Sequence, residues 1–285
     1  MPLDQVDIDK YDQELAEGKE MSFLDHLEEL RWHILRSLAA ITITGIVLFL
    51  FKNWFFETIV FGPTHDDFIS YQIICHLSEQ LGLGNTMCFS PPEFEKIAVG
   101  FAESFIMSIK VCFVAGFFVA FPYVFYQIWT FIKPGLYKNE QSATRGIVAI
   151  CSILFLMGIF FGYFVISPFA INFLGGYYIP GVTNAPTISS FITYMVMFTA
   201  PAGIIFELPI VVYFLSKIGL LTPAVMKKYR RHAIVAVLIL AALITPPDVV
   251  TQFLIGIPLF VLYELSIFVS RRVEKKEKAK WEAGE

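Results

Sequence analysis

Two glutamates have side chains that could bind arginine. Glu29 lies within residues 21–38, where leucines recur at helical spacing, and Glu140 lies in a short charged connection between two apolar segments. A carboxylate accepts two parallel hydrogen bonds from a guanidinium group, which an ammonium group cannot offer, so a pair of carboxylates could distinguish arginine from lysine. The alternative is that both are solvated surface carboxylates, which is the usual state of glutamate in a protein.

A third glutamate lies inside an apolar segment. Glu207 comes ten residues before Lys217, which places it about 15 Å along a helix axis from that end. A charge at such a depth costs roughly 2.5–3.5 kcal/mol on insertion scales, and residues of this kind are usually functional. Lys110 is the basic residue expected at a similar depth. If the two meet, they form an ion pair; otherwise Glu207 is expected to be protonated and to act as a polar docking point, or only to hold helices together.

The remaining residues with reactive side chains do not form a catalytic or metal-binding pattern. The five histidines form no His-Glu-x-x-His motif, and no glycine-rich phosphate loop or nucleophile–base motif occurs. Cys75 and Cys88 share one polar interval, where an oxidising compartment would favour a disulfide, although two unrelated thiols are the alternative. Cys112 and Cys151 lie in apolar segments and are expected to behave as small hydrophobic residues. We therefore predict neither enzyme activity nor a metal or other cofactor.

The composition indicates that these residues are carried by membrane-spanning helices. Hydrophobic residues make up 56% of the 285 residues and charged residues 16%, whereas soluble domains carry about 25% charged residues. Helices satisfy every backbone polar group internally in lipid, so we predict an all-α polytopic membrane protein. The net charge of −4 comes largely from the acidic first twenty residues and does not indicate a nucleic-acid partner.

Six transmembrane helices are predicted, the last two of them short. Pro168 and the loop-like residues 175–186 divide a long charge-free stretch. The fifth helix has twelve apolar residues and reaches only about 18 Å across a hydrocarbon core of about 30 Å. The predicted spans are 34–51, a segment within 102–132, 146–166, 188–216, 233–244 and 249–268.

Basic residues predict the orientation of these helices. Every lysine and arginine except Lys52, Lys96 and Lys110 lies in segments predicted to face one side of the membrane. Because cytoplasmic loops are enriched in basic residues, both termini are predicted to be cytoplasmic. The chain then divides into an acidic cytoplasmic extension (1–20), a membrane domain (21–270) with an outer loop insertion at about 62–96, and a charged cytoplasmic tail (271–285).

Three sequence signatures occur in order along the chain. The first is His-Leu-Glu-Glu-Leu-Arg at residues 26–31, preceded by Phe23. The second, F-x-x-P-x-L-Y-x-x-E, comprises Phe131, Pro134, Leu136, Tyr137 and Glu140. The third, T-P-P-D-x-x-x-Q, spans residues 245–252. Together with Phe-Glu-Leu-Pro at 206–209, they resemble the TatC family, the multispanning receptor subunits of the twin-arginine protein translocase, over residues 23–268.

The resemblance implies recognition of twin-arginine signal peptides on folded cargo. The residues that it implies for signal-peptide binding are Glu29, Glu140, His26, Arg31, Phe131 and Lys138. Docking of partner transmembrane helices is implied for Thr245, Asp248 and Gln252. One departure is His33, because the family often has a basic residue at this position, two residues after the arginine of the first signature.

The resemblance also implies a cellular setting. Its members work in the cytoplasmic (inner) membrane with TatA-type and, in some lineages, TatB-type single-span proteins, and copies of the chain are expected within one complex. Transport is driven by the proton-motive force rather than by ATP. Two other classes of protein remain as alternatives: a small-solute secondary transporter with Glu207 and Lys110 as its coupling pair, and a structural membrane scaffold. The absence of a recognisable internal repeat weakens the transporter alternative.

Overall fold

The computed structural model describes residues 23–80, 82, 88, 90–92, 96–132, 144–177, 179–181, 185–244 and 249–283. Helices account for nearly all of the regular structure among these residues. The described residues also contain one isolated β-bridge, between Ile97 and Thr187. The fold is therefore the predicted all-α class. The helices are α2 (Phe23–Leu50), α3 (Lys52–Trp54), α4 (Ile69–Gln80), α5 (Glu103–Ile132), α6 (Thr144–Phe161), α7 (Ser167–Gly176), α8 (Ile188–Phe206), α9 (Leu208–Lys217), α10 (Pro223–Lys228), α11 (Arg230–Ile244) and α12 (Val249–Ala283).

Four helical segments of the described chain are long and apolar enough to cross a membrane. They are His26–Leu50, Glu103–Ile132, Gly146–Gly176 and Ile188–Lys217. The chain is thus a multi-pass membrane protein, as its composition predicted. The last two predicted spans correspond to α11 and to the first half of α12. Helix α12 also continues beyond its apolar half, so that residues 271–283 of the predicted tail are helical.

The predicted end of the third span at residue 166 is wrong. The helix continues through a π-helical turn, η6 (Gly162–Ile166), directly into α7. Pro168 occupies the first turn of α7, where a residue without an N–H group is tolerated. The widened turn before it accommodates the proline, and the span therefore ends ten residues later than predicted.

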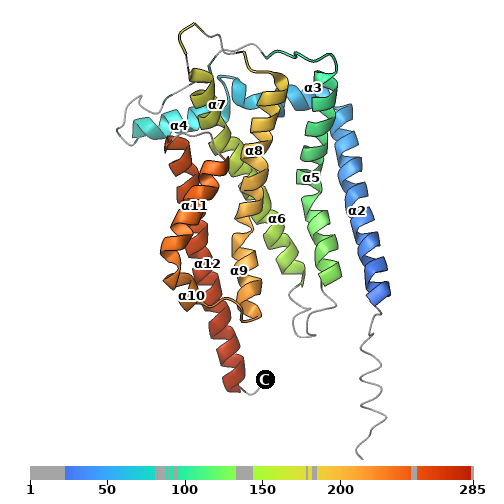
Figure 1. The fold of residues 1–285 in the computed structure, drawn as a ribbon, viewed down its shortest axis with the longest axis vertical. Helices are drawn as coiled ribbons and strands as arrows, with labels where there is room; N and C mark the ends of the chain where they lie inside the picture. Colours follow the sequence, from blue (N-terminus) through green and yellow to red (C-terminus); the bar gives the residue numbers. More distant parts are fainter. Residues whose placement is uncertain are drawn as a thin grey trace, which may run out of the picture.

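The spans stand side by side, and the two ends of the bundle differ in character (Figure 1). Helix α2 begins, and α12 ends, at the end that also holds α10, and we call this the basic end because Lys217, Lys227, Lys228, Arg230 and Arg231 lie there. The opposite end carries α3 and α4, and we call it the disulfide end after the Cys75–Cys88 bond.

Glycines allow two pairs of helices to approach closely. A Cβ atom added to Gly116 of α5 would lie 2.8 Å from the backbone nitrogen of Gly45 in α2. A Cβ atom added to Gly158 of α6 would lie 2.6 Å from the carbonyl oxygen of Ala202 in α8. Close backbone contact of this kind is a common way for helices to associate in lipid, where the hydrophobic effect between helices is absent.

Replacing Gly158 by alanine is expected to lower the thermal stability of the protein in detergent. The added methyl group meets backbone atoms, which cannot rotate away, and overpacking of this kind costs about 1–3 kcal/mol. Gly146→Ala is the matched control in the same helix, because a Cβ atom there meets no described atom within 4 Å. Melting temperatures measured by size-exclusion chromatography after heating compare the two variants. Equal melting temperatures would contradict the close packing.

A carboxylate at the disulfide end joins two spans through hydrogen bonds. Glu103, the first residue of α5, accepts hydrogen bonds from the backbone N–H groups of Val99, Gly100 and Ser189, at 2.7, 2.9 and 3.0 Å. Since Ser189 lies in the first turn of α8, these bonds join the start of α5 to the start of α8. Glu103 therefore has a structural role that its position in the sequence did not indicate.

Candidate functional site

A polar cluster lies between α2 and α5 at the basic end. His33 of α2 is 7% exposed, and its Nδ1 atom lies 2.6 Å from Oε1 of Gln127 in α5. The Nε2 atom of the same ring lies 3.9 Å from Oε1 of Glu29, one helical turn earlier. A buried histidine thus stands between a buried amide and a carboxylate, and it limits the positions that the Glu29 side chain can adopt.

The second carboxylate oxygen of Glu29, Oε2, is buried and lacks a hydrogen-bond partner among the described residues. A buried acceptor without a partner costs about 1–3 kcal/mol, more when it is charged, so a donor that reaches it gains a strong interaction. Beside it lies a cavity of about 450 Å³ lined by Glu29, Trp32, His33, Arg36 and Thr130. An incoming guanidinium group has the donors that this oxygen lacks.

An aromatic ring closes one side of this cluster. Phe131, near the end of α5, stacks on His26 with ring centroids 4.4 Å apart and planes inclined by 18°. The same ring meets His33 edge-on, with centroids 6.2 Å apart. The structure therefore brings together three of the residues predicted for signal-peptide binding, Glu29, His26 and Phe131.

The other residues predicted for this site are not among those that the structure brings together. Arg31 points to solvent and forms an ion pair with Glu28, 3.5 Å long, in which both side chains are about two-thirds exposed. Glu140 and Lys138 lie outside the described residues. Sequence reasoning missed Gln127 altogether and treated His33 only as a departure from the family pattern. A polar amide in an apolar transmembrane helix was the available signal, since such groups usually have a partner or a function.

Glu207 occupies a break in the fourth span. Helix α8 ends at Phe206 and α9 begins at Leu208, with Pro209 in its first turn. Both carboxylate oxygens of Glu207 are buried and have no hydrogen-bond partner among the described residues. The buried thiol of Cys151 in α6 lies close to this carboxylate. A buried polar group without a partner is expensive, which makes this break a second candidate site.

Glu207 and Lys110, for which the sequence left an ion pair open as one alternative, do not meet. Both residues are described, the side chain of Lys110 is exposed, and Glu207 forms no salt bridge within 4.0 Å with any described residue. The exposed side chain of Lys110 lies on a face of α5 that points away from the bundle. The rotation of a helix about its axis, and not only the depth of a residue in the membrane, decides which side chains meet. The ion pair that supported a coupled transporter is therefore absent.

The side chain of Gln252 forms a hydrogen bond within the chain. Its Nε2 atom donates a hydrogen bond to the carbonyl oxygen of Leu238, 3.1 Å away, and so joins α12 to α11. Thr245 and Asp248, the other residues predicted for partner docking, lie outside the described residues. The amide thus has at least one structural role in holding the last two helices together.

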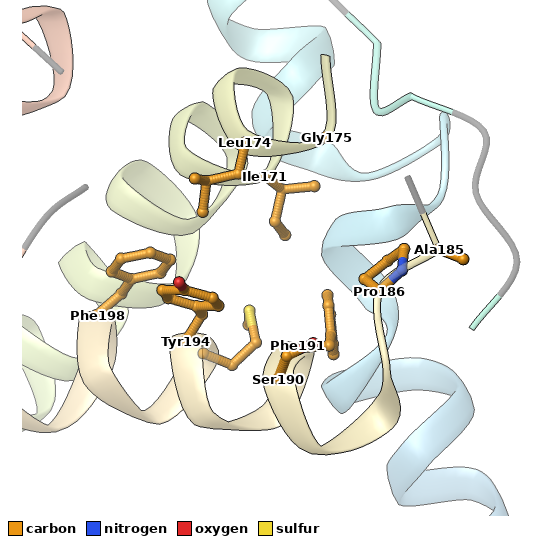
Figure 2. Close-up of a pocket in the computed structure, with 10 residues that line it drawn as sticks. Ile171, Leu174, Gly175, Ala185, Pro186, Ser190, Phe191, Tyr194 and Phe198 are labelled. Atoms are coloured by element: carbon orange, nitrogen blue, oxygen red, sulfur yellow. The ribbon is translucent and has the colours of Figure 1, made fainter. Parts of the chain in front are cut away.

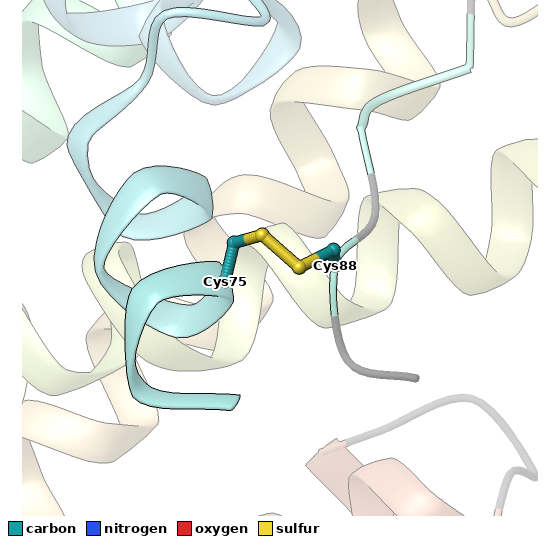
Figure 3. The surroundings of a disulfide bond; sticks show 2 residues. All are labelled: Cys75 and Cys88. Atoms are coloured by element: carbon teal, nitrogen blue, oxygen red, sulfur yellow. A yellow bond between two sulfur atoms is a disulfide. The ribbon is translucent and has the colours of Figure 1, made fainter. Parts of the chain in front are cut away.

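Cys75 of α4 is joined to Cys88 by a disulfide bond, with the Cα atoms 4.4 Å apart (Figure 3). The predicted pairing is confirmed. Cys112 and Cys151 are free and buried, as expected of small hydrophobic residues in spans. The bond ties α4 to a later part of the same loop and thereby stabilises the disulfide end.

A separate cavity of about 270 Å³ lies between α7 and α8 at the disulfide end (Figure 2). Its walls are mainly apolar and include Ile171, Leu174, Phe191 and Phe198. The hydroxyl of Ser190, which also lines it, already donates to the carbonyl oxygen of Thr187, 2.8 Å away. The cavity lacks a charged group among its lining residues, so it is a poorer candidate for arginine than the cluster at Glu29.

Comparison with known proteins assigns the chain to a family. Residues 25–258 match the family model described as Sec-independent protein translocase protein (TatC). A Sec-independent protein translocase protein TatC from a Blattabacterium of Periplaneta americana is 38% identical over 263 residues, covering 92% of this chain and 99% of the relative. The Aquifex aeolicus protein of the same name is 33% identical, covering 90% of this chain and 98% of the relative.

The fold agrees with this match. A crystal structure of the twin-arginine translocase receptor TatC in DDM has a TM-score of 0.66 and 32% sequence identity, covering 86% of this chain and 99% of that one. The residues matched by the family model include the cluster at Glu29 and the break at Glu207. The chain belongs to the TatC family of Sec-independent protein translocase proteins.

Proposed function

We propose that this chain is the subunit of the twin-arginine translocase that binds the paired arginines of signal peptides, with Glu29 as one of the two carboxylates. The observation that carries the proposal is the Oε2 atom of Glu29, which is shielded, unpartnered and adjacent to a cavity of about 450 Å³. A guanidinium group would satisfy this oxygen with a charge-assisted hydrogen bond, and Phe131 would offer an apolar surface beside it. The chain has no catalytic step in this role.

Glu140 is the second carboxylate of the proposed site, with Lys138 and Arg31 at its edge. Glu140 follows Phe131 by nine residues, and an extended chain covers about 3.3–3.6 Å per residue. The connection is therefore long enough to return to the cluster, where Phe131 already contacts His26. Two carboxylates matched to two arginines would account for selectivity over a pair of lysines, whose ammonium groups cannot bind bidentately.

The proposed topology places this site on the cytoplasmic face. The basic end of the bundle is cytoplasmic by the positive-inside rule, so both termini are cytoplasmic, and six spans cross the cytoplasmic (inner) membrane. The domain division is the one predicted from the sequence, with the outer loop insertion at about 62–96. TatA-type and TatB-type single-span proteins, and further copies of this chain, are the proposed partners. Thr245, Asp248 and Gln252 form the proposed docking segment for partner helices.

Photo-crosslinking of a twin-arginine signal peptide to the purified protein tests the proposal. The peptide carries a photoreactive residue next to the arginine pair, and the control peptide has lysines in place of both arginines. We expect crosslinks to the residues around Glu29 with the arginine peptide and a large loss of yield with the lysine peptide, because lysine cannot form the bidentate contact. Equal yields from both peptides would reject the proposed receptor role.

A further inference from the structure

Helix α4 (Ile69–Gln80) presents an apolar strip that no described residue covers. Ile69, Ile73 and Leu77 follow one another at intervals of four residues and are 55%, 59% and 52% exposed. Residues at this spacing lie on one face of a helix. The neighbouring exposed strip is polar and contains Gln72, His76 and Gln80, of which the last two lie 3.2 Å apart through their Nε2 atoms. The outward side of α4 is therefore amphipathic.

The inward side of α4 is held firmly against the rest of the protein. Ser70, Tyr71 and Ser78 are buried, and the hydroxyl of Tyr71 donates a hydrogen bond of 2.6 Å to the carbonyl oxygen of Pro63. Burial, with a smaller contribution from Asp66, raises the pKa of that hydroxyl, so it remains a donor. The Cys75–Cys88 bond adds a covalent connection. Rotation of α4 that would bury its apolar strip is thus prevented.

The start of α4 lies at the level of the spans, as its contacts with the third span show. Phe68, the residue before α4, packs against Tyr163 and Phe164 of the third span, with ring centroids 5.5 Å from each. Phe164 precedes the end of that span, Gly176, by twelve residues, which is about 18 Å along a helix axis. The start of α4 therefore lies beside the spans rather than beyond their ends. Figure 1 shows α4 lying across the bundle, close to the level at which α2 ends.

Side chains beyond α2 mark the boundary of the bilayer at this level. Lys52 and Trp54 follow the end of α2 and are both exposed, and residues of these types favour the membrane–water interface. A helix that lies at this boundary with one apolar and one polar strip has the properties of an interfacial helix. If the bilayer boundary lies at this level, lipid is the surface that such a strip would contact.

We infer that α4 is an in-plane interfacial helix whose strip Ile69–Ile73–Leu77 inserts into the lipid leaflet at the disulfide end of the bundle. The polar strip of Gln72, His76 and Gln80 faces the headgroups and water. In this position α4 anchors the outer loop to the membrane surface beside the third span. The inference depends on the membrane embedding of the spans and is independent of the proposed binding of signal peptides.

Site-specific fluorescence in vesicles tests this placement. A prodan-type fluorescent amino acid is introduced at Ile73, or at His76 as the matched control on the polar strip one turn away, in the full chain with its disulfide intact. The proteins are reconstituted into vesicles of phosphatidylethanolamine and phosphatidylglycerol. We expect blue-shifted emission at position 73 that is quenched by lipids with a doxyl group in the acyl chain and protected from aqueous iodide. Position 76 is expected to show the opposite pattern.

Two outcomes would overturn the inference. Quenching by iodide at both positions would place the apolar strip in water. Blue-shifted emission at position 73 that neither doxyl lipids nor iodide quench would mean that protein, such as a second copy of this chain, covers the strip. Size-exclusion chromatography of both labelled proteins verifies that they are folded. If the variant at position 73 does not fold, the same measurement at Leu77 replaces it.

Discussion

Replacing Glu29 by glutamine is expected to weaken binding of a twin-arginine signal peptide by about 2–5 kcal/mol, because a buried arginine–carboxylate contact loses its charged partner. Glutamine has nearly the same shape as glutamate, so the cluster with His33 and Gln127 is expected to remain assembled. Its amide oxygen can still accept a hydrogen bond but carries no charge. The affinity of a labelled signal peptide for the purified variant measures the effect.

Glu28→Gln is the matched control for this change. Glu28 lies one residue earlier in α2, and its ion pair with Arg31 is exposed, so its removal is expected to change peptide affinity by only about 0–1 kcal/mol. The lysine-substituted peptide provides a second comparison, since Glu29→Gln is expected to reduce the preference for arginine. If Glu29→Gln binds both peptides as the parent protein does, Glu29 is not part of the arginine site.

Replacing Glu207 by alanine is expected to abolish export of folded cargo while signal-peptide binding is retained. The carboxylate lies in the break between α8 and α9, and both its oxygens are buried without a described partner. We propose that this group supplies a polar docking point for a ligand or partner helix during transport. The break lies on a different span from Glu29, so removal of its side chain is not expected to disturb the cluster between α2 and α5.

Three readouts separate function from folding at this position. The amount of protein in the membrane, the affinity for signal peptide and the rate of export are measured for Glu207→Ala and for Glu207→Gln. Lys110→Gln is the matched control, because Lys110 is exposed and unpaired with Glu207, and its export is expected to equal that of the parent. Normal export by Glu207→Ala would refute the functional role, and loss of both Glu207 variants from the membrane would show a structural one.

The class of fold and the place of most spans could be predicted from the amino-acid sequence alone. Long apolar stretches have few alternatives to a membrane-spanning helix, since the lipid environment requires internal backbone hydrogen bonds. Four of the predicted spans therefore recur in the structure, the third with a later end. The family could also be predicted, because its signatures at Glu29, Glu207 and Thr245 are linear patterns that need no knowledge of the fold. The pairing of Cys75 with Cys88 was accessible for a similar reason, as both lie in one loop.

Contacts between helices depend on how the helices pack and could not be predicted from sequence spacing. His33 and Gln127 are 94 residues apart in the chain, and whether they meet depends on the rotation and crossing of α2 and α5. The same dependence explains why Glu207 and Lys110, expected at a similar depth, do not pair. The third span continues past Pro168 because a π-helical turn accommodates it. Sequence spacing gives the depth of a side chain in the membrane, whereas packing between helices decides which direction it faces and therefore which group it can bind.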